Sequence, residues 1–499
     1  MIRRLLLVVV VTVALVVVLA GGVFAWLFAG DGVRLALERQ MSAWLGQPVR
    51  IGEATATLLP RLAIRLGQVS VGEPVRMTLD RVDLSTGVRA LLAKRLEDAE
   101  VSVSGSRVEM PLPFGLPAVT ATPGGAADEA EASGMQLVSV RRITLRDVTL
   151  VSLGRELQIA VDSSLNGSRL AITRFTASAG DLSIDAHGSV DFTPRVVANL
   201  QATSNLLDVD SLLALAGAFM GTPATGTGAD SSGARISVHV MAARARAAGI
   251  DLANFDAAVT AYAGEVTLDP LLFDVFGGHH EGWLSATLGD TLDVRVGSSV
   301  GDIDVAQLAA FGGVPGSISG RLAATGRFGA RGRDIGAVLA SARGIGDVTI
   351  REGSMRGLDL VRTVLSFFGR SSETSSVAAG STFDHITGTF ALGDRRVSSE
   401  DLSLESDDVD VLARGTLALD TKALDGRASL VLSEALSARA GQRLYRYTMM
   451  GNRVVLPATV GGTLSTPTIG IDTTAAMRRA IVNEVERRLK DFFERVGPF

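Results

Sequence analysis

Few residues of this chain could hold a metal ion, because its 499 residues include five histidines and no cysteine. His279, His280 and Glu281 stand next to one another and at first resemble part of a zinc site. Adjacent side chains of an extended strand point to opposite faces, so these two histidines cannot share one ion without a special turn. No third ligand is evident, and the H-x-x-x-H spacing of zinc-binding helices is missing. We therefore expect a solvated turn flanked by glycines, and no metal site.

Acidic clusters are the other candidates for metal binding or acid–base chemistry. Asp407, Asp408 and Asp410 could suggest calcium, but they lack the loop spacing and the terminal Glu of an EF-hand. A solvated strand edge explains them more simply. No residues near Asp302 and Asp304 in the sequence indicate a pocket, and we expect a helix cap at this position.

Motifs for catalysis are also missing. Gly-rich stretches such as residues 326–336 lack the Lys-Ser/Thr pair of a phosphate-binding loop, so their glycines are expected to bend strands. No G-x-S-x-G nucleophile elbow occurs, and without cysteine there is no thiolate nucleophile. The net charge of −5 and the lack of a basic region disfavour nucleic-acid binding. We predict a protein that is not an enzyme, with no catalytic residue, no cofactor, no metal and no nucleic-acid partner.

The N-terminus carries an uncharged run from Leu5 to Gly30, directly after Arg3 and Arg4. At about 1.5 Å per residue, a helix of this length spans a hydrocarbon core of about 30 Å. The Arg pair predicts that the N-terminus is cytoplasmic. A cleaved signal peptide is the alternative, with Val23-Phe24-Ala25 as its cleavage site, although the apolar run continues beyond it. We expect residues 1–30 to anchor a single-pass protein whose remaining chain lies outside the cytoplasm.

Alternation of apolar and polar residues with a period of two dominates the chain after the anchor. It is clearest in residues 181–192, 316–328 and 408–420, which at roughly 12 residues are about twice as long as a usual strand. A small residue, often Gly, stands in the middle of each apolar face and marks a bend or bulge. Long bent strands with one apolar face predict a curved sheet or trough. The residues predicted to line it are Ile143, Leu145, Leu182, Ile184, Val190, Phe192, Ile318, Leu322, Phe328, Val409, Val411, Leu417 and Leu419.

Short helices interrupt the predicted strands. We expect them at residues 34–45, 85–94, 210–219, 304–311 and 358–368, and loops at 111–134, 221–233 and 370–381. The chain ends in a predicted amphipathic helix from Thr473 to Val496, whose apolar stripe is as typical of a helix facing a core as of one at a membrane interface. The stripe consists of Met477, Ile481, Val485, Leu489, Phe492 and Val496. The predicted fold class is mainly β with short helices: a transmembrane helix, an elongated, curved antiparallel β-sheet or groove, and a C-terminal amphipathic helix.

Several short blocks stand out at residues 45–49, 60–64, 69–72, 346–360, 383–402 and 461–467. Taken in order, these blocks resemble the AsmA-like family of bacterial envelope proteins. The order and spacing of the blocks carry the resemblance, and the stretch around residues 200–300 matches least clearly.

The resemblance implies a repeating β-groove protein, similar to bridge-like lipid transfer proteins, anchored in the inner membrane and projecting into the periplasm. It implies movement of phospholipid towards the outer membrane, and it brings no catalytic residues. The chain is then divided into an anchor (1–30), an N-terminal AsmA-like groove segment (31–112), a linker (113–134), a middle groove segment (135–300), a C-terminal AsmA-like segment (301–472) and the amphipathic helix (473–499).

A trough with one apolar face lets acyl chains leave water while a polar head group stays hydrated. Each buried CH₂ group contributes about 0.8 kcal/mol, so a continuous apolar track removes most of the barrier to extracting a lipid. The expected function is non-enzymatic transfer of phospholipid between inner and outer membranes in outer-membrane biogenesis, with phospholipid cargo, the inner membrane and an envelope protein as partners. Two alternatives stay open. The apolar faces pack under the chain's own helices as an ordinary core, or the protein is an assembly factor that supports outer-membrane protein insertion through its sheet edges.

Overall fold

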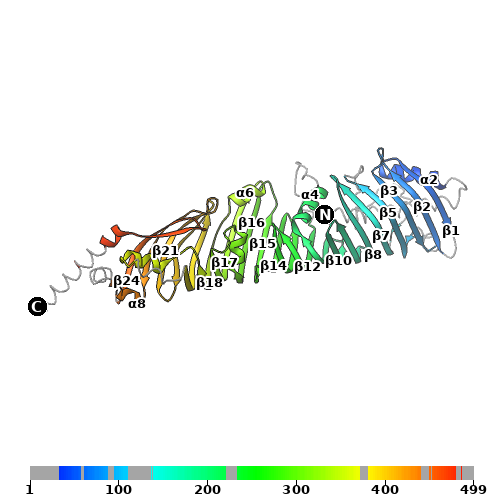
Figure 1. Cartoon of the computed structure of the whole chain (residues 1–499). Coiled ribbons are helices and arrows are strands. Elements are labelled where there is room, and N and C mark those ends of the chain that lie inside the picture. The colour runs from blue at the N-terminus through cyan, green and yellow to red at the C-terminus, as the bar shows by residue number, and fades with distance from the viewer. Residues whose placement is uncertain are drawn as a thin grey trace, which may run out of the picture. The chain divides into compact units, whose positions relative to one another are not determined.

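The computed structural model describes most of the chain after the predicted anchor (Figure 1). The described residues are 33–57, 61–87, 95–110, 136–137, 139–220, 233–370, 380–439, 449–450, 452–478 and 485. The predicted anchor at 1–30 lies outside them. Among the described residues, no helix is long and apolar enough to cross a membrane. The contacts within the chain divide it into two units, 1–264 and 265–499.

Unit 1 contains one large open sheet in which successive strands lie side by side. Its strand order is β1-β2-β3-β5-β7-β8-β9-β10-β11-β12-β13. Two short strands, β4 (Arg95–Leu96) and β6 (Gln136–Leu137), pair separately. The strands of the large sheet are β1 (Val49–Thr57), β2 (Leu62–Val71), β3 (Met77–Thr86), β5 (Ala99–Glu109), β7 (Ser139–Ser152), β8 (Arg155–Asn166), β9 (Arg169–Ala179), β10 (Leu182–Asp191), β11 (Val197–Asp208), β12 (Arg235–Ala247) and β13 (Ile250–Tyr262).

Two neighbouring pairs of this sheet, β5–β7 and β11–β12, are parallel, and the other pairs are antiparallel. An antiparallel pair needs only a hairpin, whereas a parallel pair needs a connection that returns the chain to the end where the first strand began. Helix α4 (Val209–Met220), close to the predicted helix at 210–219, forms part of this return between β11 and β12. Asp208 caps α4, because its Oδ1 accepts a hydrogen bond from Ser211 N at 2.8 Å.

Helix α2 (Val33–Leu45), predicted at 34–45, closes the outer edge of β1, as Figure 1 shows in blue. Arg34 Nη1 donates to Ile51 O at 3.1 Å, and Glu38 Oε1 accepts from Ile51 N at 2.8 Å. Ser42 Oγ accepts from Val49 N at 2.9 Å. Three backbone groups of an edge strand, which would otherwise face water or another strand, are therefore satisfied by helix side chains.

Unit 2 also contains one large open sheet, and all its neighbouring pairs are antiparallel. Its order is β14-β15-β16-β17-β18-β19-β20-β21-β22-β24-β25, with the short β23 (Met449–Met450) paired to β24. The helices are α5 (Val305–Phe311), α6 (Ile335–Ala340), α7 (Leu360–Phe367) and α8 (Glu434–Ala438). The strands are β14 (Glu265–Val275), β15 (Gly278–Thr287), β16 (Leu292–Asp304), β17 (Ile318–Gly332), β18 (Arg343–Met355), β19 (Ser381–Gly393), β20 (Arg396–Glu405), β21 (Val409–Ala418), β22 (Leu424–Leu432), β24 (Arg453–Gly462) and β25 (Pro467–Ile471).

Three short helices of unit 2, α5, α6 and α8, begin at side chains that accept hydrogen bonds from the first turn. Asp304 Oδ1 accepts from Ala306 N at 2.9 Å, which confirms the predicted cap of α5. Asp334 and Ser433 cap α6 and α8 in the same way. These two helices were not predicted, because at 6 and 5 residues they are too short to show a helical period.

A β-bulge in β16 keeps its apolar residues on one face. Pairing with β17 shifts between Val300 and Ile303, and Asp302 there has a φ of 54°. The extra residue lets two apolar side chains three positions apart point the same way, and it bends the strand. Asp302 therefore belongs to a bulge, and only Asp304 of the predicted pair is a helix cap.

Two predicted elements differ from the structure. The helix predicted at 85–94 is wrong at its start, because β3 extends to Thr86 and the period-two pattern continues through it. Residues 88–94 lie outside the described part. The turn predicted at residues 279–281 is also wrong, because all three residues belong to β15. The boundary predicted between residues 300 and 301 falls inside β16.

Of the predicted C-terminal helix, residues 473–478 and 485 are described. Residues 473–478 are helical, and Asp472 Oδ1 caps them by accepting from Ala475 N at 2.9 Å. Two members of the predicted stripe, Met477 and Val485, are 69% and 51% exposed. At these two positions the stripe is not buried against the sheet.

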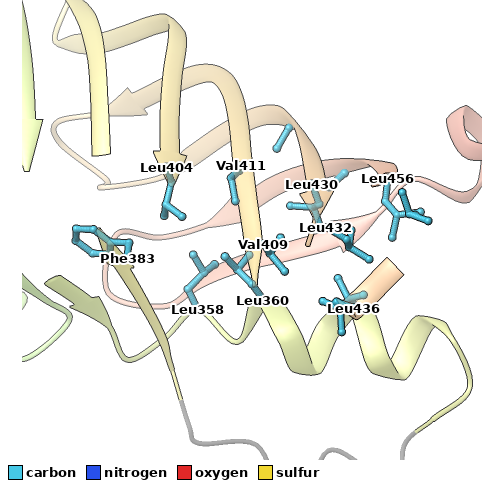
Figure 2. Close-up of a cluster of buried hydrophobic side chains, with 14 of the residues drawn as sticks. Leu358, Leu360, Phe383, Leu404, Val409, Val411, Leu430, Leu432, Leu436 and Leu456 are labelled. Carbon is cyan, nitrogen blue, oxygen red and sulfur yellow. The ribbon is translucent and has the colours of Figure 1, made fainter. Parts of the chain in front are cut away.

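The main core of unit 2 lies between the end of the sheet and the two helices α7 and α8 (Figure 2). Leu360, Val364 and Leu365 of α7 are almost fully buried. Helix α7 follows β18, yet it also packs against β25 at the far edge of the sheet. A methyl group added at Gly357, just before α7, would lie 3.1 Å from Pro467 Cδ of β25. The sheet from β18 to β25 is therefore rolled around α7.

Candidate functional site

The apolar face of unit 2 carries a continuous row of residues that runs across the strands. Antiparallel pairing sets Leu284 opposite Val296 and Val296 opposite Phe328, and the same register continues to β22. Every member of the row is partly exposed. We name it the open row, and its members are Leu268, Leu284, Val296, Phe328, Gly344, Leu392, Val397, Leu417 and Leu424.

A second row lies on the same face, nearer the other ends of the same strands. From β19 onwards it is buried, with Ile386 7%, Leu430 0% and Leu456 0% exposed. We name it the sealed row. Its members are Ile303, Leu322, Ile350, Ile386, Leu404, Val411, Leu430 and Leu456.

The helices explain the difference between the two rows. Helices α5, α7 and α8 follow β16, β18 and β22 at the strand ends that carry the sealed row. The labelled side chains of Figure 2 show Leu360 and Leu436 next to Val409 and Leu432, so the helices fill the space above these strand ends. At the open row, α6 follows β17 and packs against β16 and β17, and its Leu339 is 70% exposed.

Aromatic rings lie flat on glycines beside the open row. A methyl group added at Gly326 would lie 2.8 Å from the Phe328 ring, and one at Gly344 would collide with the same ring. Gly346 is covered by Phe390 in the same manner. The two rings lie 6.2 Å apart between centroids. Because the glycines have no side chain, the rings lie against the backbone and give a broad, flat apolar surface.

His280 places a titratable ring on this apolar face. Its ring stacks on Phe273 with centroids 4.2 Å apart and an interplanar angle of 6°. Burial lowers the pKa of His280, because the charged ring loses its hydration, while Glu281 nearby acts in the opposite direction. The ring is therefore neutral at neutral pH, as an apolar surface requires.

Unit 1 shows a similar division along its own sheet. On the apolar face of β2 to β8 the side chains are buried, with Leu66 0%, Val82 0% and Ile143 0% exposed. From β9 to β13 one row is partly exposed at every strand. Its members, which pair successively, are Ile172, Gly188, Leu200, Val238 and Val259.

The thirteen residues predicted to line the trough fall into three groups. Those on the apolar face that are buried are Ile143, Leu145, Leu182, Val190, Val409 and Val411. Those partly exposed are Ile184, Phe192, Ile318, Leu322, Phe328 and Leu417. Leu419 lies beyond the end of β21 and is 48% exposed. Val409 and Val411 belong to the core under α7, so they do not line an open surface.

Several members of the open row were missed by sequence reasoning. Leu268, Leu284 and Val296 lie in strands whose alternation is broken by a bulge at Asp269 and Pro270 or by a run of glycine and serine. Leu392 and Val397 flank a tight hairpin turn, where a period of two cannot be counted across the turn. A search for alternation on each side of a Gly or Pro would have found them.

The polar motifs do not assemble into a site. His279 lies against Gly301 on the polar face and His280 lies on the apolar face, so the two rings are separated by the sheet. Asp410 accepts from Arg453 at 2.8 Å, while Asp407 and Asp408 are exposed. Within the described ranges, no group of three or more His, Asp or Glu residues could hold a metal ion.

The arrangement offers a long apolar surface for contact. No family model, curated protein or solved structure matches the chain. The function is therefore inferred from the sheet faces themselves.

Proposed function

We propose that the protein carries phospholipid along the apolar faces of its sheets without catalysing a reaction. The observation that supports this most strongly is the open row. Nine adjacent strands each present an apolar residue or glycine at the same height, and each is partly exposed. At about 4.8 Å per strand spacing, this row is about 38 Å long.

The chemistry of the row suits sliding better than tight binding. An acyl chain gains about 0.8 kcal/mol for each CH₂ group removed from water, wherever along the row the contact is made. The flat rings of Phe328 and Phe390 add area without a deep pocket that would hold one ligand. A surface of uniform affinity lowers the cost of leaving a bilayer and leaves no single position where the cargo stops.

The proposal includes the setting that the sequence suggests. Residues 1–30 would anchor the chain in the bacterial inner membrane, the sheets would lie in the periplasm, and the protein would belong with the AsmA-like proteins that it resembles. The alternative role as an assembly factor acting through sheet edges is disfavoured at β1, because α2 already occupies the hydrogen-bonding groups of that edge.

Site-specific photo-crosslinking tests the proposal. A benzophenone amino acid at Val296, in the open row, should cross-link to phospholipid in cells, and mass spectrometry should identify the adduct. The matched control is Leu412, which is 54% exposed on the polar face of β21 and should give no lipid adduct. Equal lipid labelling at both positions, or none at Val296 in a folded protein, would overturn the proposal.

A further inference from the structure

A depression of about 1040 Å³ lies in the polar face of unit 2, on the opposite side of the sheet from the open row. Two neighbouring cross-strand rows form its floor, and both extend across the strands from β15 towards β20. Six strands with five spacings of about 4.8 Å give a floor about 24 Å long. The surface is therefore elongated.

The first row of the floor is flat and partly apolar. Trp283, Gly297, Arg327, Ile345 and Ala391 are paired one after another. A methyl group added at Gly297 would collide with Trp283 Nε1, so the indole ring lies against the backbone of β16. Trp283 remains 37% exposed and Ile345 68% exposed. Together they offer an aromatic plate and an aliphatic patch from strands three positions apart, with Gly297 and Arg327 between them.

The second row offers hydrogen-bonding groups of both kinds. Glu281, Ser299, Thr325, Asp347 and Thr389 are also paired in succession, and each is exposed. Thr325 Oγ1 donates to Asp347 Oδ2 at 3.1 Å, which fixes the orientation of that carboxylate. Hydroxyl groups donate and accept, while the carboxylates accept.

We propose that this depression binds a linear β-1,4-linked oligosaccharide. A pyranose ring has an apolar face of C–H groups and a rim of hydroxyl groups, which matches an aromatic plate beside a row of hydroxyls and carboxylates. Sugars linked in this way form an extended ribbon, and the floor is elongated across its six strands. The proposal concerns the polar face and does not depend on the lipid function of the apolar face.

The hydroxyl groups of the floor favour a sugar over a basic peptide. The lining also holds four carboxylates, of Asp269, Glu281, Asp347 and Glu400, which would attract a cationic peptide, and Arg327 in the adjacent row opposes only part of that attraction. The three hydroxyl side chains of the second row would add little to the binding of a chain of positive charges. They can form hydrogen bonds with a ligand whose own rim consists of hydroxyl groups.

Calorimetric titration of the full-length protein in detergent with chitohexaose and cellohexaose tests the inference. Binding of at least one hexasaccharide is expected, and Trp283→Ala should weaken it by roughly tenfold or more, because an aromatic anchor carries a large share of such binding. Leu412→Ala is the matched control, since it removes an exposed apolar side chain from the same polar face outside the depression and should leave the affinity unchanged. Circular dichroism checks that both variants keep the sheet.

Hexalysine in place of the sugar separates the alternatives. Salt-sensitive binding of hexalysine with no response to either hexasaccharide would assign the depression to a basic peptide and overturn the proposal. Binding of a hexasaccharide that is equal in the wild type and in folded Trp283→Ala would place the sugar elsewhere. No heat from either hexasaccharide with the wild-type protein would also overturn it.

Discussion

The open row and the sealed row of unit 2 lie on the same face of the same strands, yet they have different environments. On β21, Val411 is 5% exposed beneath α7, whereas Leu417, six residues further along, is partly exposed in the open row. Both are apolar and both point to the same side of the sheet. The comparison shows that alternation along a strand determines which face is apolar, while the helices at the strand ends determine which part of that face is core.

Replacing a leucine by aspartate should give the largest difference in effect between the two rows. Leu430→Asp places a carboxylate where the side chain is 0% exposed, and an unpaired buried charge costs at least several kcal/mol, so unit 2 should unfold. Leu417→Asp in the open row can keep its carboxylate hydrated, so the sheet should persist while co-purified phospholipid falls. Circular dichroism and lipid mass spectrometry measure the two effects.

Leu412→Asp on the polar face of the same strand is the control for both variants and should change neither the fold nor the lipid content. If Leu417→Asp folds and retains its lipid, the open row is not the contact surface. If Leu430→Asp stays folded, Leu430 does not belong to the buried core under α7.

Truncation to alanine should give a smaller contrast of the same kind. Leu430→Ala leaves a cavity and should lower the free energy of unfolding by about 2–5 kcal/mol. Leu417→Ala removes a side chain that already contacts water, and its cost should be about 1 kcal/mol. Urea unfolding followed by circular dichroism measures both, and equal costs would contradict the division of the face.

The alternation of residues predicted which face of each strand is apolar, but not which part of that face the helices bury. The alternation in residues 181–192, 316–328 and 408–420 correctly predicted β10, β17 and β21 and the side on which their apolar residues lie. It placed Val411 and Leu417 together in one trough, because nothing in β21 itself distinguishes them. The distinction depends on α7, which leaves the sheet at β18 and returns to β25, and local periodicity carries no information about such a packing.

The next largest loss of stability is expected at the helix caps beside the sealed row. Asp304→Ala removes the acceptor for Ala306 N and should destabilise α5 by about 1 kcal/mol. Asp304→Asn keeps an acceptor and should restore most of the loss. Chemical denaturation of the two variants measures the difference, and an equal loss in both would show that the charge matters rather than the cap.

Protonation of His280 should give the smallest effect. Because burial lowers its pKa in the folded state, the unfolded chain binds the proton first as the pH falls from about 6.5, so stability decreases below that pH until the folded-state pKa is reached. His280→Phe keeps a ring that can stack on Phe273 and should lack this part of the pH dependence. Melting temperatures between neutral and mildly acidic pH test it, and parallel curves for the two proteins would exclude the effect.

The side chains of Arg34, Glu38 and Ser42 along β1 have a consequence for how the chain behaves while it folds. A bare outer strand is a template on which strands from other molecules can grow into fibrils. Because α2 and β1 are neighbours in sequence, the protected margin can form before most of the later strands have joined the sheet. Through this margin, a partly folded unit 1 is thus shielded from seeding disordered polymers.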